Sequence, residues 1–444
     1  MTAVGMRRIA AAAALAAVSA AVAAGGADSG GAVAGPQIDP APAAVSAGLA
    51  HSSDPVRAAE YWIDDYGIRD AWKTTRGKGV KIAIIDTGIG KGPAEFEGAV
   101  VGGTDVSGLG SADGRTPVGS ADSDHGSWVA SLAAARGAGK GKGMIGVAPD
   151  AELLSISVGF GSSATTPFTD QIAEAMRWAV DNGADVINLS LTTNRPDWDE
   201  SWDDAFLHAF DNDVVVVVAA GNRGAGTTRV GAPATIPGVL TVAGVDRQGR
   251  ASVEASTQGI TLGVAAPSEE LVGVSADGRV VDWRGTSGAA PIVAGVVALV
   301  RAAHPDLDAA NVINRIVETA RLDSGKTSLL YGHGLVDAKR AVSATVERVD
   351  ENPMGSLSEW IRVFRRAASQ PSDEPSVGPV DIPSLPPAEP PTAAGSPLLP
   401  TPDTIRYGTL PLIVVTVPAI LIGLGVTAAV RRIRSARSSG ASSS

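Results

Sequence analysis

The sequence predicts an α/β fold, a three-layer sandwich in which a mainly parallel sheet lies between helices. Short, nearly uninterrupted apolar runs recur along the chain, as in strands that are buried on both faces of a parallel sheet. Segments with helical spacing of apolar residues alternate with these runs, as in strand–helix–strand units with right-handed crossovers. The chain has 444 residues, of which 44% are hydrophobic, and this is enough for one large core.

The apolar runs place the strands along the chain. The predicted strands are residues 81–86, 153–158, 185–191, 214–220 and 239–245. The clearest helix follows the second of them, in FTDQIAEAMRWAVDNGAD, with Thr169 or Asp170 as its N-cap and Asn182 and Gly183 at its end. Ligands of such folds bind at the carboxyl ends of the strands, so we expect the chemistry there.

The N-terminal part of the chain is typical of an exported protein. Residues 1–24 are predicted to be a signal peptide, because Arg7 and Arg8 precede the weakly hydrophobic IAAAAALAAVSAAVAA and small residues that suit cleavage. Residues 25–60 are short and rich in Ala, Gly and Ser, which predicts an N-terminal extension or short pro-segment. The globular domain is predicted over residues 61–346.

The C-terminal part is typical of a membrane anchor. Residues 347–409 are predicted to form a Pro-rich linker or stalk, extended at about 3 Å per residue. The uncharged residues 410–430 are long enough for a transmembrane helix. The arginines of the basic tail, 431–444, place that tail in the cytoplasm. The sequence therefore predicts a single-pass protein of the cell membrane with its domain outside.

Charge and cysteine content exclude some functions. The net charge of −11 argues against binding to nucleic acid, which usually needs a basic face. The chain has no cysteine, and therefore no disulfide, thiolate nucleophile or cysteine metal site.

Four polar residues stand at the ends of predicted elements. Asp86 closes a strand, His125 precedes a helix of small residues, Asn222 follows a strand, and Ser287 heads a long apolar helix. Each taken alone has a structural explanation: an Asx-turn, a cap, a turn, and a helix N-cap. Together they supply a carboxylate, an imidazole, an amide donor and a hydroxyl, which is what acyl transfer by a serine requires.

The motifs around these residues resemble the subtilisin family of serine proteases. VKIAIIDTGI, DHGSWVASLAA and RGTSGAAPIVAGVVALV are similar to the family's aspartate, histidine and serine segments, and the resemblance covers roughly residues 60–345. It implies a subtilisin-like fold in which Asp86 orients His125, His125 acts as base and then acid, and Ser287 is the nucleophile. Asn222 and the Ser287 backbone N–H are implied as the oxyanion hole.

The resemblance also implies where a peptide substrate binds. The substrate-binding residues are expected to be Ser190, Leu191, Thr192, Ala220 and Gly221. Their segments would line the pocket for the residue before the cleaved bond, and their backbone would pair with the extended substrate. Thr192 and Thr193 stand where the family usually has glycines, so we expect a narrowed pocket.

The sequence departs from the family pattern near the proposed chemistry. Trp128 replaces a second histidine on a helix that normally packs tightly, and Gly288 follows the serine where a larger residue is usual. No metal or cofactor is required by the chemistry. The acidic residues of 197–204, and Asp122 with Asp124, are compatible with a structural calcium ion, but they form no regular ligand loop.

The overall architecture resembles the mycosins, which are membrane-anchored subtilases associated with type VII secretion in actinobacteria. The resemblance implies a protein or peptide substrate, attachment to the membrane and, as one alternative, association with a type VII secretion complex. Three other functions stay open: a generic anchored subtilase that clears the cell surface, a catalytically weak or silent scaffold that stabilises such a complex, and a module that binds peptides without cleaving them.

Overall fold

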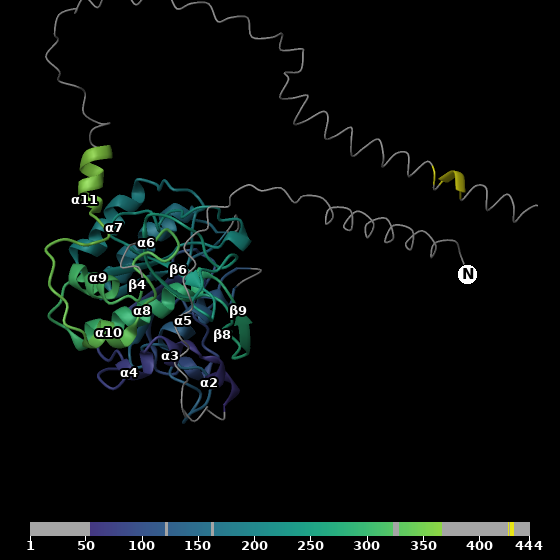
Figure 1. Ribbon diagram of the computed structural model, residues 1–444, viewed down its shortest axis with the longest axis horizontal. Coiled ribbons are helices and arrows are strands. Elements are labelled where there is room, and N and C mark those ends of the chain that lie inside the picture. Colours follow the sequence, from purple (N-terminus) through teal and green to yellow (C-terminus); the bar gives the residue numbers. More distant parts are fainter. Residues whose placement is uncertain are drawn as a thin grey trace, which may run out of the picture. The chain divides into compact units, whose positions relative to one another are not determined.

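The computed structural model describes residues 54–119, 123–160, 164–322 and 328–365, together with Gly425 and residues 427–429 (Figure 1). Its centre is a seven-stranded parallel sheet with the strand order β2-β3-β1-β4-β5-β6-β7. The strands are β1 (Lys81–Asp86), β2 (Val100–Asp105), β3 (Glu152–Ser157), β4 (Val186–Leu189), β5 (Val215–Ala219), β6 (Leu240–Val245) and β7 (Leu262–Pro267). The predicted fold class is confirmed.

The five predicted strands are all present, and the two strands that sequence reasoning missed are the edges of the sheet. β2 contains Gly102 and Gly103 and is only partly buried, so it lacks a continuous apolar run. β7 contains Gly263 and ends at Pro267, both of which weaken the strand pattern. Edge strands tolerate these residues because one side of their backbone has no partner strand.

Helices cover both faces of the sheet. α5 (His125–Ala134) and α8 (Thr286–Ala303) pack on each other, and α6 (Phe168–Asp181) and α7 (Ser201–Asp211) form a second pair. α5 lies in the connection from β2 to β3, and α6 lies in the connection from β3 to β4. Both connections move along the sheet in the same direction, so the strand order and right-handed crossovers alone do not explain this pairing of the helices.

The starts of two helices differ from the prediction. The N-cap residue of α6 is Pro167, so Thr169 and Asp170 lie inside the first turn. The N-cap residue of α8 is Gly285, with a φ of 146°. Ser287 is therefore the second residue of its helix, and its hydroxyl is available for a role other than capping.

α8 is the one helix among the described residues that is long and apolar enough to cross a membrane. It is 78% buried inside the domain, where it packs against α5 and strands β4 to β7, so it is a core helix. The predicted transmembrane helix, 410–430, lies outside the described residues except for Gly425 and residues 427–429, which are helical. The predicted signal peptide also lies outside them.

Shorter elements complete the domain. Their bounds are α2 (Pro55–Ala59), α3 (Trp62–Asp65), α4 (Ile68–Ala71), α9 (Ala309–Glu318), α10 (Ala338–Ser343), α11 (Leu357–Trp360), the 3-10 helices η1 (Ala94–Phe96) and η2 (Arg223–Ala225), the π-helix η3 (Ile361–Arg365), and the antiparallel strands β8 (Leu271–Val274) and β9 (Val280–Trp283). The β8–β9 hairpin packs against α5, beside the sheet edge where the chemistry was predicted.

The domain begins before the predicted boundary at residue 61. Asp54 caps α2 by accepting hydrogen bonds from the backbone N–H groups of Val56 and Arg57. The carboxylate of Glu60, whose side chain is only 1% exposed, accepts a hydrogen bond of 2.6 Å from the Ile145 backbone N–H. The end of the predicted extension is therefore part of the folded domain.

The buried carboxyl of Glu60 makes the stability of the domain depend on pH. Burial raises its pKa from 4.5 to about 8, so the native state holds a proton that the unfolded state has released between these pH values. The contribution of Glu60 to the free energy of unfolding should then be fully present below about pH 4.5 and fall, by up to about 1.4 kcal/mol per pH unit, as the pH rises to 8. Glu60→Gln keeps an acceptor for Ile145 without titrating, so urea unfolding should lack this slope. The exposed Glu97→Gln is the control, and equal slopes in all three proteins would contradict the assignment.

The domain also extends beyond residue 346, into the segment that was predicted to start the stalk. Trp360 of α11 stacks on Trp198, with ring centroids 4.5 Å apart. Arg365 lies within 6 Å of both rings and forms ion pairs with Glu200 (3.0 Å) and Asp203 (2.6 Å). The prediction was wrong for residues 347–365, because their contacts are with a distant acidic segment that local composition does not reveal.

Candidate active site

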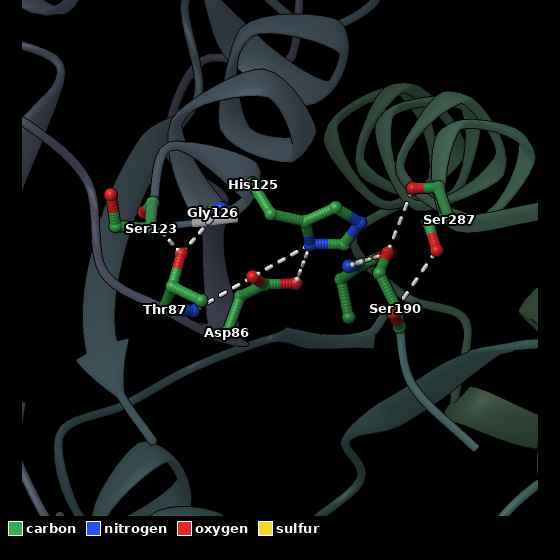
Figure 2. A network of polar contacts seen from close by, with 8 residues as sticks. Asp86, Thr87, Ser123, His125, Gly126, Ser190 and Ser287 are labelled. Carbon is green, nitrogen blue, oxygen red and sulfur yellow. Dashed lines mark hydrogen bonds and ion pairs between the residues drawn. The ribbon is translucent and has the colours of Figure 1, made fainter. Parts of the chain in front are cut away.

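Asp86 and His125 meet at the carboxyl end of β1. Asp86 is the last residue of the strand and is fully buried, and His125 is the first residue of α5. His125 Nδ1 lies 2.8 Å from Asp86 Oδ1 and 3.0 Å from Oδ2. A carboxylate accepts at this position, so Nδ1 carries the proton, and the other ring nitrogen, on the side of Ser287 in Figure 2, is the one that can act as a base.

Thr87 fastens α5 to the end of β1. Its hydroxyl donates to the Ser123 carbonyl (2.7 Å) and accepts from the Gly126 backbone N–H (2.8 Å), as Figure 2 shows. Its own N–H donates to Asp86 Oδ1 at 2.7 Å. A Cβ on Gly126 would lie 2.6 Å from the Gly88 carbonyl oxygen, so only glycine allows this approach. The aspartate and the histidine are thus held by backbone contacts on both sides.

Ser287 lies across from His125 in the first turn of α8 (Figure 2). Its hydroxyl donates a hydrogen bond of 3.2 Å to the Ser190 carbonyl, and its own carbonyl accepts from the Ser190 hydroxyl at 2.9 Å. The Ser287 hydroxyl therefore has the Ser190 carbonyl as its acceptor in this structure. Catalytic hydrogen bonds are often loose without substrate and tighten when it binds.

Asn222 follows β5 and is held through its side-chain carbonyl. Asn222 Oδ1 accepts from the Thr286 N–H (2.7 Å) and from the Thr286 hydroxyl (3.0 Å). The same hydroxyl accepts from the Gly221 N–H at 3.0 Å. Thr286 therefore fixes the amide so that its two N–H donors point away from this contact, next to Gly285, where a Cβ would lie 3.0 Å from Asn222 Nδ2.

The predicted substrate-binding residues follow neighbouring strands, β4 and β5, but most of their side chains are buried. The exposed fractions are 4% for Ser190, 6% for Leu191 and 0% for Ala220. Gly221 has a φ of 102°, and a Cβ there would lie 2.6 Å from Thr227 Cγ2. These residues can present mainly backbone to a substrate, which fits pairing with an extended peptide.

The two threonines that were expected to narrow the pocket use their hydroxyls in different hydrogen bonds. The Thr193 hydroxyl donates to the Ala232 carbonyl at 3.1 Å, and the Thr192 hydroxyl accepts from the Asn194 N–H at 3.2 Å. The Thr193 side chain is therefore committed to the 231–232 loop. Only Thr192 stays a candidate for limiting the pocket.

The acidic segments make protein contacts. Among the residues that the structure describes, no group of three or more His, Asp or Glu side chains is placed to hold a metal ion. In residues 197–204, Asp199 accepts from the Ser201 N–H, while Glu200 and Asp203 pair with Arg365. Asp124 accepts from the Ala276 N–H (3.2 Å), and Asp122 lies outside the described residues.

Sequence reasoning missed two threonines that position the site. Thr87 and Thr286 each stand next to a predicted site residue, Asp86 and Ser287, and both are buried. A small hydroxyl residue beside each was a usable signal, because a buried hydroxyl must find a hydrogen-bond partner.

Comparisons with known sequences agree with the geometry of the site. A profile of the subtilase family, peptidase S8, matches residues 77–334. Mycosin-4 of Mycobacterium tuberculosis is 34% identical over 344 residues, covering 68% of this chain and 73% of the relative. Subtilisin DY of Bacillus licheniformis is 35% identical over 271 residues, covering 60% of this chain and 92% of the relative.

Solved structures give the same result. The crystal structure of MycP1 without its N-terminal propeptide has a TM-score of 0.55 and 30% identity, covering 66% of this chain and 99% of that one. The structure of the MycP3 protease from the type VII (ESX-3) secretion system has a TM-score of 0.55 and 32% identity, covering 67% and 90%.

Proposed function

This chain belongs to the subtilase family of serine peptidases, and we propose that Asp86, His125 and Ser287 are its catalytic triad. The observation that carries the proposal is the pair of short contacts from His125 Nδ1 to the buried Asp86 carboxylate, with Ser287 on the other side of the ring (Figure 2). This arrangement sets the tautomer of the imidazole and leaves its second nitrogen for the serine hydroxyl.

The proposed reaction is the hydrolysis of a peptide bond through an acyl-enzyme. His125 takes the proton of Ser287 as its oxygen attacks the peptide carbonyl. It then gives that proton to the departing amine, so that the C–N bond breaks and an ester on Ser287 remains. Water attacks the ester with His125 again as base, which releases the acid and restores the hydroxyl. Asp86 stabilises the imidazolium that forms in both steps.

Asn222 Nδ2 and the backbone N–H of Ser287 are the proposed oxyanion hole. The Ser287 N–H lies in the first turn of α8, at the positive end of an 18-residue helix, which favours negative charge there. The fixed orientation of Asn222 supports this role, since both bonds to its carbonyl oxygen come from Thr286.

A role of Asn222 in the oxyanion hole predicts a graded loss of kcat in variants of Asn222 and Thr286. Asn222→Ala should lower kcat by about 10²- to 10³-fold, with a smaller change in KM, because the donor acts on the transition state. Thr286→Val keeps the shape but removes the hydroxyl that orients the amide, so kcat should fall by about tenfold. Thr286→Ser is the matched control and should retain activity. Steady-state kinetics on a peptide ester test these variants. An unchanged kcat in Asn222→Ala would show that Asn222 is not part of the oxyanion hole.

The substrates proposed for this chain are proteins or peptides near a membrane. The more specific proposal is a role in a type VII secretion system, and it is supported by the similarity of this chain to the MycP3 protease of such a system. The uncharged stretch 410–430, followed by arginines, supports a single membrane span with the domain on the extracytoplasmic side. The reaction uses only protein groups and needs no cofactor.

Labelling with a fluorophosphonate tests the proposal on the full-length chain. The reagent reacts with a serine that a neighbouring base activates, so the wild type should be labelled, and Ser287→Ala and His125→Ala should not. Thermal unfolding of all three proteins shows that each is folded. A folded wild type that takes no label would contradict the proposed enzyme and favour the alternative, a silent scaffold of the subtilase fold in a secretion complex.

A further inference from the structure

Two tryptophan side chains stand beside the imidazole of His125. The ring centroids of His125 and Trp283 lie 5.7 Å apart with an interplanar angle of 80°, and those of His125 and Trp128 lie 6.1 Å apart at 64°. The two indole rings are 5.7 Å from each other. Both side chains are partly exposed, so a bound molecule can reach them. Trp128 and Trp283 together are called the indole wall below.

The indole wall is held by the β8–β9 hairpin. Trp128 Nε1 donates a hydrogen bond of 2.9 Å to the hydroxyl of Ser275, in the turn of the hairpin. A Cβ on Gly273 of β8 would lie 2.9 Å from both Trp128 Cβ and Trp283 Nε1. The missing side chain at Gly273 therefore makes the room in which the two indoles meet, and their positions are set by packing.

Gly288, the residue after the proposed nucleophile, belongs to the same arrangement. A Cβ at this position would lie 2.2 Å from Leu271 Cδ1 and 3.4 Å from Trp283 Cη2. The side chain of Leu271 thus fills the space that a Cβ at position 288 would need, and the Trp283 indole lies within van der Waals distance of the same point, beside the first turn of α8. The surface beside the nucleophile is formed by this ring from the hairpin.

The indole wall lies on the side of the site from which the amine product departs. The segments proposed to hold the acyl part of the substrate follow β4 and β5, which are neighbours to one side of β1. The Ser190 carbonyl and hydroxyl, which contact Ser287, mark that side. The hairpin instead packs on α5, next to His125. His125 delivers its proton to the leaving amine, so the residue after the cleaved bond must lie near this ring.

We propose that Trp128 and Trp283 select the residue that directly follows the cleaved bond, with a preference for a large apolar or aromatic side chain. The inference rests on the proposed function and names a specificity for it. Indole faces give apolar contact and favourable edge or offset stacking, whereas a carboxylate side chain against these faces would lose water without gaining a partner. The expected preference over glycine is about three- to tenfold.

The acyl-enzyme allows this subsite to be measured apart from the acyl side. When an amino acid amide replaces water, its nitrogen attacks the Ser287 ester and the bond from the carbonyl carbon to Ser287 Oγ breaks. His125 takes a proton from the amine and returns it to the serine oxygen. The products are a new peptide bond and a free hydroxyl, and the amide side chain occupies the subsite under test.

The experiment uses the full-length chain with a peptide ester as substrate. It measures how the acyl-enzyme is partitioned between hydrolysis by water and transfer to added amino acid amides. Equal concentrations of phenylalaninamide, leucinamide and glycinamide compete, and the peptide products are separated by chromatography. The wild type should transfer to phenylalaninamide and leucinamide about three to ten times more than to glycinamide. Trp283→Ala should bring the ratio toward one, and Trp283→Phe should retain most of it.

Matched variants separate this role from a general effect on the fold. Trp360→Leu removes an equally partly exposed indole from the contact with Trp198, and it should leave the ratio unchanged. Fluorophosphonate labelling shows that each variant is folded and active. Equal transfer to all three amides by a labelled wild type, or an unchanged ratio in labelled Trp283→Ala, would overturn the inference alone. A wild type that forms no acyl-enzyme would overturn the proposed function and the inference with it.

Discussion

Replacing Ser287 by alanine is expected to lower kcat by on the order of 10⁶-fold while the domain stays folded. The substitution removes the nucleophile, so the covalent route is lost, and only binding and the oxyanion hole remain to accelerate attack by water. The fold should tolerate it, because alanine is the residue with the best helix propensity and Ser287 makes one side-chain hydrogen bond, to the Ser190 carbonyl. The measurement is kcat on a peptide ester beside the urea midpoint of each protein.

The matched comparison is a double variant. His125→Ala alone should lower kcat nearly as much as Ser287→Ala does. The double variant should lower kcat little further, because the effects of residues that act as one unit are not additive. Independent losses in the double variant would mean that the two residues do not form a unit. In cells, a Ser287→Ala chain that keeps its biological effect would favour the scaffold alternative over the enzyme.

Replacing Asp86 by asparagine is expected to lower kcat by about 10³- to 10⁴-fold. The Thr87 N–H requires an acceptor at Oδ1, so the asparagine amide nitrogen would take the place of Oδ2, 3.0 Å from His125 Nδ1. A donor would then face a donor, and the negative charge that stabilises the imidazolium would be gone. Turnover should fall far more than substrate affinity, since the charge matters most after proton transfer.

Asp105→Asn is the control for this change. Asp105 closes β2, which lies on the other side of β3 from β1, and, like Asp86, it lies opposite Ser157 of β3 in the strand register. Its carboxylate accepts from Ser107 and Ser157 rather than from a histidine. Asp105→Asn should therefore alter the urea midpoint and leave kcat near that of the wild type. A similar loss of kcat in both variants would point to strain in the sheet instead of a role of Asp86 in the reaction.

The sequence was a good guide to the sheet because buried parallel strands have a local signature. The runs around Ile84 and Val217 are apolar on both faces, and this can be read without knowing any partner strand. The signature fails at the edges, where Gly102 and Pro267 interrupt it. It also says nothing about the hairpin that carries Trp283, whose strand is only partly buried.

The limits of the domain could not be read from composition. Residues 347–365 look like the start of a linker because they are polar and precede the Pro-rich stretch. Their structure depends on the stacking of Trp360 against Trp198 and on the ion pairs of Arg365. A hydrophobic contact between distant segments leaves no periodic mark in either segment, so local reasoning ends the domain too early.

By itself, the sequence determined the fold class, the positions of five core strands along the chain and the four polar residues at the ends of elements, because each of these is set by a local pattern of residue types. The tertiary structure alone decided which groups hold those four residues. Thr286 orients Asn222, Thr87 fastens α5, and Trp283 meets Trp128 beside His125. These contacts arise because buried polar groups and rings must find partners, and the partners are known only once the chain has folded.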